Sequence, residues 1–242
     1  PQNHQQRPLK MDTQELQPFS QTTLSEQDSS DRVTCTAHSL INLVTLAGGK
    51  VTDNEITYLK NKIVEEGKPL DSTFKETFIK THGFFAENLY MFFQTEILFP
   101  QTVDAVANGL VSNLQRGPIL LSIASELSQR DRRVVTEKDF GDKEADSHAV
   151  VAVIKGRAVF LIDPYKPYSP ERFDINEEKQ RLELVAWFTS SRARRTLIDS
   201  QKTVDSQSIL NESISMLSNP KTAQKYIAET LSYTGPLLVH NS

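Results

Sequence analysis

The fold is decided by residues 147–164, whose sequence is SHAVVAVIKGRAVFLIDP. Two apolar runs within it, 147–154 and 158–162, are rich in β-branched residues and have the length of buried strands. The three residues between them suit a tight turn, and proline at 164 ends the second strand because it cannot continue a ladder. We therefore expect an antiparallel hairpin.

This hairpin places a base beside a carboxylate. His148 begins its first strand and Asp163 ends its second, and in a hairpin these two ends lie side by side. An imidazole oriented by a third group is the general base of nucleophilic enzymes. The alternative is that His148 and Asp163 only mark strand ends, since Asp-Pro is a common stop signal.

The nucleophile that such a pair would serve is Cys35, the one cysteine of the chain. Apolar residues at helical spacing follow it up to Gly48-Gly49, so Cys35 is expected in the first turn of a buried helix. The positive end of a helix favours a thiolate. The alternative is a small buried hydrophobic residue, which is the commoner role of a lone cysteine.

Together these residues predict a catalytic triad with Cys35 as nucleophile, His148 as general base and Asp163 as the residue that orients the histidine. His38 lies one turn after Cys35 and is interpreted as structural. The backbone N–H of Cys35 is one natural oxyanion donor, while the second donor is left open among Gln27, Ser29, Ser30 and Asp31. No cofactor and no metal are expected, and a single cysteine excludes an intramolecular disulfide or a multi-cysteine zinc site.

The remaining pattern predicts an α+β protein with helices in its first half and antiparallel strands after them. Three helices are expected from Thr52 or Asp53, from Asp71 or Ser72, and from Thr102 to Gln115. Strands are expected at 119–123 and at Glu183–Phe188, with a solvated excursion over 125–146. Two C-terminal helices are expected, Ser208–Leu217 and Pro220–Ser232.

The domain organisation follows from composition. Residues 1–30 are polar and predict a flexible arm, 31–200 a catalytic domain, and 201–242 a helical extension. The net charge is −4 and the basic residues are scattered except for Arg192, Arg194 and Arg195, which argues against nucleic-acid binding. The apolar runs are far shorter than the roughly 20 residues of a membrane-spanning helix. We expect a soluble, cytoplasmic protein, located in the host cytosol if it is an exported effector.

Two segments carry a resemblance to known families. The sequence Cys35-Thr36-Ala37-His38-Ser39-Leu40-Ile41-Asn42-Leu43 resembles the nucleophile helix of Josephin-type deubiquitinases, C-A-x-H-x-L-x-N-L, although Ser30 stands where that family has a glutamine. The His148 and Asp163 segments resemble papain-like effector proteases and deamidases that bacteria inject into host cells. Both resemblances imply the papain-like superfamily and a papain-like fold, with the nucleophile helix packed on a C-terminal antiparallel sheet.

Three functions follow as hypotheses. The first is a cysteine protease or isopeptidase acting on a protein, with ubiquitin or a ubiquitin-like modifier as the substrate to test first. The second is a glutamine deamidase or transglutaminase that uses the same triad. The third is a non-enzymatic protein-binding module, in which the aromatic stretch 84–99 forms either a docking surface or core.

Overall fold

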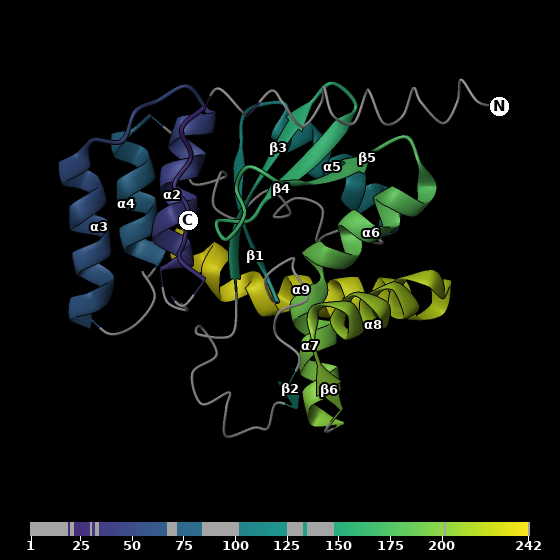
Figure 1. Cartoon of the computed structure of the whole chain (residues 1–242). Helices are drawn as coiled ribbons and strands as arrows, with labels where there is room; N and C mark the ends of the chain where they lie inside the picture. Colours follow the sequence, from purple (N-terminus) through teal and green to yellow (C-terminus); the bar gives the residue numbers. More distant parts are fainter. Residues whose placement is uncertain are drawn as a thin grey trace.

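The protein is an antiparallel sheet between two layers of helices, as Figure 1 shows. The computed structural model describes residues 19, 22–29, 31, 34–66, 72–83, 102–124, 133–134, 148–200 and 202–241. The α+β class predicted from the sequence is confirmed. The aromatic stretch 84–99 and most of 125–146 lie outside the described residues.

The main sheet has four strands in the order β1-β3-β4-β5, all antiparallel. The strands are β1 (Ile119–Ile123), β3 (His148–Lys155), β4 (Ala158–Ile162) and β5 (Glu171–Asp174). β3 and β4 form the predicted hairpin, with Lys155 opposite Ala158 and Val151 opposite Ile162. Gly156 takes a φ of 60° in the turn, a left-handed conformation that glycine adopts without steric cost.

Both faces of this sheet are buried, which explains why its strands are continuously apolar rather than alternating. Leu120, Val151 and Phe160 belong to one core, on the side of the N-terminal helices. Their chain neighbours Leu121, Val150, Ala152 and Leu161 point the other way, into a second core. The sheet is therefore the middle layer of three.

The first helical layer consists of α2 (Cys35–Leu46), α3 (Asp53–Glu66) and α4 (Ser72–Thr81). α2 begins at Cys35 as predicted and ends before Gly48, whose φ is 91°. α2 packs directly on β3. Phe19 and Leu24, which belong to the segment predicted as an arm, are buried in this layer, and the Phe19 ring meets Phe160 edge-on at a centroid distance of 5.3 Å.

The second helical layer is built mainly from the C-terminal part of the chain. Its helices are α5 (Val103–Leu114), α6 (Glu178–Phe188), α7 (Ser190–Asp199), α8 (Ser206–Ser218) and α9 (Pro220–Asn241). The predicted helices at 102–115, 208–217 and 220–232 are confirmed. A short antiparallel ladder joins β2 (Arg133–Val134), inside the predicted excursion, to β6 (Thr203–Val204).

The prediction of a strand over Glu183–Phe188 is wrong, because these residues form the second half of α6. The helix begins at Glu178, and the residues that open it, Glu178-Lys179-Gln180-Arg181, are good helix formers. The buried residues that follow, Leu184 to Trp187, form an apolar run too short to distinguish a strand from a buried helix by pattern.

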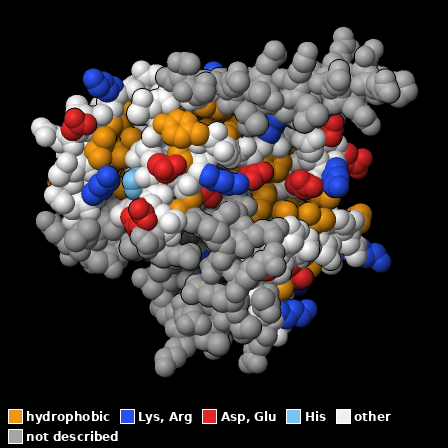
Figure 2. All heavy atoms as spheres, viewed as in Figure 1, with side chains coloured by type: hydrophobic (Ala, Val, Ile, Leu, Met, Phe, Trp, Pro, Cys, Tyr) orange, Lys and Arg blue, Asp and Glu red, His pale blue; other side chains and the backbone are white. Residues whose placement is uncertain are grey.

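The surface carries charges of both signs. On the face in Figure 2, basic and acidic side chains are interspersed among apolar ones. Two residues of the predicted basic cluster are paired within the molecule, Arg192 with Glu229 at 3.1 Å and Arg195 with Asp199 at 3.3 Å. Arg194 is buried and donates to the carbonyl of Ala124. Among the described helices, none has the length and apolar character needed to cross a membrane.

Candidate active site

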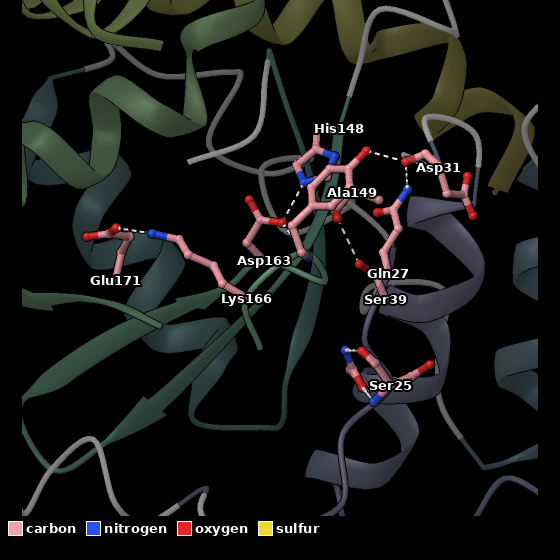
Figure 3. Close-up of polar contacts among 11 residues, drawn as sticks. Ser25, Gln27, Asp31, Ser39, His148, Ala149, Asp163, Lys166 and Glu171 are labelled. Atoms are coloured by element: carbon pink, nitrogen blue, oxygen red, sulfur yellow. Dashed lines mark hydrogen bonds and ion pairs between the residues drawn. The ribbon is translucent and has the colours of Figure 1, made fainter. Parts of the chain in front are cut away.

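The β3–β4 hairpin brings the predicted histidine and aspartate together. Nε2 of His148 donates to Oδ1 of Asp163 at 2.9 Å, and Figure 3 shows the two side chains facing each other. Asp163 is 1% exposed, and its Oδ1 also accepts the backbone N–H of Tyr165 at 2.9 Å. A buried carboxylate with two donors has a fixed orientation, so it fixes the imidazole as well.

Cys35 completes the group from the other side. It is the first residue of α2, and its side chain hydrogen-bonds to that of His148. Because Nε2 of His148 faces Asp163, Nδ1 is the nitrogen that meets the sulfur. The sulfur also accepts hydrogen bonds from the backbone N–H of Ala149 and from the hydroxyl of Thr36. The structure thus brings the three predicted residues into one hydrogen-bonded row.

The electrostatics of this row favour an ion pair. Burial opposes a charged sulfur, but the hydrogen bond and charge of His148 outweigh it and lower the pKa of Cys35 below its ordinary 9.0. Burial also opposes a charged imidazole, yet hydrogen bonds to Asp163 and Cys35 and their negative charges raise the pKa of His148 from 6.5 to about 10. Both shifts favour a thiolate beside an imidazolium over two neutral groups.

Tyr165 braces the histidine, a role that sequence reasoning missed. Its ring stacks on that of His148, with centroids 5.3 Å apart and planes 13° apart. Its hydroxyl donates to the backbone carbonyl of Asp31, just before α2. The residue therefore links the hairpin to the segment that precedes α2. The available signal was an aromatic residue two positions after Asp163.

Residues 24–27 form a strap between α2 and the loop after β4. Asn42 of α2 bonds both backbone groups of Ser25, accepting its N–H at 2.6 Å and donating to its carbonyl at 3.0 Å. His38 meets the Ser25 hydroxyl at 2.6 Å. On the other side, the Tyr168 hydroxyl accepts from the backbone N–H of Leu24 at 2.9 Å. Polar residues of α2 thus bond to one part of the segment 1–30 that composition predicts to be a flexible arm.

The strap carries Gln27 to the site. This residue is 2% exposed, and its backbone N–H donates to Pro164 at 2.8 Å. Its Nε2 donates to the carbonyl of Asp31 at 3.0 Å, while Oδ1 of Asp31 accepts the N–H of Thr34, the N-cap of α2. Of the four candidates for a second oxyanion donor, Gln27 is the one with a buried side-chain amide, and that amide bonds a carbonyl four residues before Cys35.

The fold and site therefore define an α+β protein with a buried Cys-His-Asp row at a helix N-terminus. No cluster of three or more His, Cys, Asp or Glu side chains suited to a metal ion occurs in the described ranges. Comparisons with family models, with curated proteins and with solved structures found no match to this chain.

Proposed function

We propose that the chain is a papain-like cysteine hydrolase that cleaves a peptide or isopeptide bond in a protein substrate. The observation that supports this most directly is that His148 is hydrogen-bonded to both Cys35 and Asp163. A structural cysteine needs neither a basic partner nor a lowered pKa. The reaction requires a reduced thiol, so we propose the cytoplasm as its location, or the host cytosol for an exported protein.

In the proposed reaction, the thiolate of Cys35 attacks the carbonyl carbon, and the electron pair of the C=O bond moves onto oxygen. The N–H of Cys35 and the second N–H of the Gln27 amide stabilise this oxyanion. The imidazolium of His148 then gives its proton to the departing amine, leaving a thioester. Water, deprotonated by the neutral His148, hydrolyses the thioester and releases the acid and the thiolate.

Asp163 acts through His148 in this scheme. Its carboxylate keeps the Nε2 proton in place, so the other nitrogen always faces the sulfur. It also stabilises the imidazolium before the proton is transferred. Tyr165 limits ring rotation by stacking.

The substrate that we propose to test first is ubiquitin, because the sequence of α2 resembles that of Josephin-type deubiquitinases. Ubiquitin with an electrophilic C-terminus should add one covalent mass to the full chain, and Cys35→Ala should abolish the addition. The intact mass of the mixture checks this result. Ubiquitin-like modifiers with the same warhead form a parallel arm.

Other outcomes separate the remaining hypotheses. Release of ammonia from a partner protein without cleavage would select a glutamine deamidase over a protease. Failure of every probe to label, together with an iodoacetamide rate at neutral pH equal to that of a free thiol, would contradict a cysteine hydrolase and favour a binding module.

A further inference from the structure

Ser39 ties the nucleophile helix to the strand that carries the base. It lies four residues after Cys35 on α2, which places both side chains on the same face of the helix. Its hydroxyl donates to the backbone carbonyl of Ala149 at 2.7 Å, and Ser39 is 0% exposed. Ala149 directly follows His148. Figure 3 shows this bond running from α2 to the start of β3.

The backbone of Ala149 is available to α2 because β4 is shorter than β3. β4 pairs with β3 from Val151 to Lys155. The N–H and C=O of one strand residue point to the same neighbour, and residues two apart point the same way. The N–H and C=O of Ala149 therefore point to the side of β3 on which β4 lies, but β4 ends before it reaches Ala149.

Two side chains of α2 hydrogen-bond to the backbone of Ala149, where β4 no longer pairs with β3. Cys35 receives the N–H of Ala149, and Ser39 donates to its C=O. Two side chains from one turn of α2 thus make the hydrogen bonds to Ala149 that a neighbouring strand would otherwise make. A backbone carbonyl that is buried must find a donor, and Ser39 supplies it.

We infer that Ser39 is a positioning residue, which sets the separation between the Cys35 sulfur and the His148 ring by fixing the start of β3 against α2. The inference rests on the proposed function and adds to it the group that holds nucleophile and base in register. Without the hydroxyl, the first residues of β3 lose their tie to α2. The sulfur then loses alignment with both the Ala149 N–H and the imidazole.

The test uses the reactivity of Cys35 in the full chain. Because the chain has one cysteine, iodoacetamide reports that thiol alone. The alkylation rate is measured against pH for the wild type, Ser39→Ala and Ser39→Thr, at a temperature where circular dichroism shows all of them folded. We expect Ser39→Ala to raise the pKa of Cys35 by at least about half a unit, which leaves about threefold less thiolate below that pKa. Ser39→Thr keeps a hydroxyl and should restore the profile.

The matched control is Ser213→Ala. Ser213 is also 0% exposed on a helix, and its hydroxyl donates to the carbonyl of Ala186 at 2.8 Å, within the C-terminal layer. This variant should unfold at lower denaturant concentration with an unchanged pH profile for Cys35. If Ser39→Ala behaves in the same way, Ser39 is an ordinary packing hydroxyl and the inference is overturned, while the proposed function stands. A wild-type thiol that titrates near 9.0 overturns both.

Discussion

At the scale of single residues, the central feature is a carboxylate that acts on a sulfur through an imidazole. Asp163 touches His148 but is not a partner of Cys35 in the row, so its charge reaches the sulfur by keeping His148 protonated. The charge and the hydrogen bond can be separated experimentally. Asparagine keeps an acceptor at the same position without the charge.

For Asp163→Asn we expect the His148 pKa to fall from about 10 by about one unit or more, because the neutral amide no longer attracts the imidazolium. Above the new pKa the ring loses its proton, so the ion pair ends at lower pH than in the wild type. The pKa of Cys35 should rise at the same time. Imidazole resonances followed by NMR across pH 5–11 measure the first shift, and alkylation kinetics measure the second.

A pH titration of His148 that is the same in Asp163→Asn as in the wild type would contradict the coupling. The control is Glu55→Gln, which removes the carboxylate from another histidine pair, Glu55 with His82 at 2.6 Å. That pair joins α3 to the turn after α4, while the groups that lower the pKa of Cys35 are His148, Ala149 and Thr36, so the loss of the pair should leave the reactivity of Cys35 unchanged.

The sequence allowed Cys35, His148 and Asp163 to be predicted because each lies at an end of an element with a clear pattern. Ser39, Ala149 and Tyr165 gave no comparable signal. The role of Ala149 depends on which way its backbone points, and residue type does not set that direction. The role of Gln27 stays open in the sequence because an offset of eight residues does not determine whether its amide approaches Cys35.

At the scale of elements, one face of α2 makes two sets of contacts, because residues three, four and seven apart lie on the same side of a helix. Cys35 and Ser39 contact β3, and His38 and Asn42 contact the strap. Asn42 is 0% exposed and satisfies both backbone groups of Ser25. The side-chain amide of Asn42 therefore bonds the strap in the way that the peptide group of a neighbouring strand would.

We expect Asn42→Ala to release the strap. The loss of two hydrogen bonds should lower the free energy of unfolding by about 1–3 kcal/mol. It should also speed hydrogen exchange at the Ser25 and Gln27 amides more than elsewhere, because these amides lie in the strap. Exchange followed by mass spectrometry checks the second effect.

The control for this variant is Asn113→Ala. Asn113 bonds a carbonyl of its own helix, Gly109 at 2.9 Å, far along the chain from the strap. Equal exchange at Ser25 in Asn42→Ala and in the wild type would show that the strap is held by other contacts.

The predictability of the elements followed the length of their patterns. β3 and β4 were clear since a β-branched apolar run with a turn and a proline stop has few alternatives. The strand predicted over Glu183–Phe188 is wrong because the short buried run of α6 has no helical signal apart from the polar first turn that precedes it. α7 has no clear sequence signal, because three arginines interrupt the apolar pattern of its buried residues Ala193, Leu197 and Ile198.

At the scale of the whole molecule, the C-terminal helices belong to the same core as the sheet. Ile209, Leu217, Tyr226 and Ile227 are buried with residues of β1, β3 and β4. The contact reaches the site, because Ser190 of α7 accepts the N–H of Ala124 at 3.0 Å, and Ala124 follows Ile123, the partner of His148 in the ladder.

Truncation after residue 201 should therefore abolish cooperative unfolding and return the pKa of Cys35 toward its ordinary 9.0, although Cys35, His148 and Asp163 all remain in the chain. The physical reason is the apolar surface of the sheet and of α6 and α7 that the deletion exposes to water. Calorimetry and the alkylation rate of the truncated chain check this expectation. A truncated chain that unfolds cooperatively and keeps the reactive thiol would support the separate 201–242 extension expected from composition.

A single substitution tests the packing of the C-terminal helices without shortening the chain. Tyr226→Phe keeps the ring but removes a hydroxyl that donates to the Thr189 carbonyl at 2.6 Å, and should cost about 1–2 kcal/mol.

The separation of Cys35 from the hairpin along the chain has a consequence for biosynthesis. The helix that carries the sulfur leaves the ribosome about a hundred residues before His148 does, and chains fold from the N-terminus as they emerge. Throughout that interval the nascent polypeptide lacks the imidazole that lowers the pKa of the Cys35 thiol. The thiol therefore keeps its ordinary pKa until the hairpin has been translated and folded.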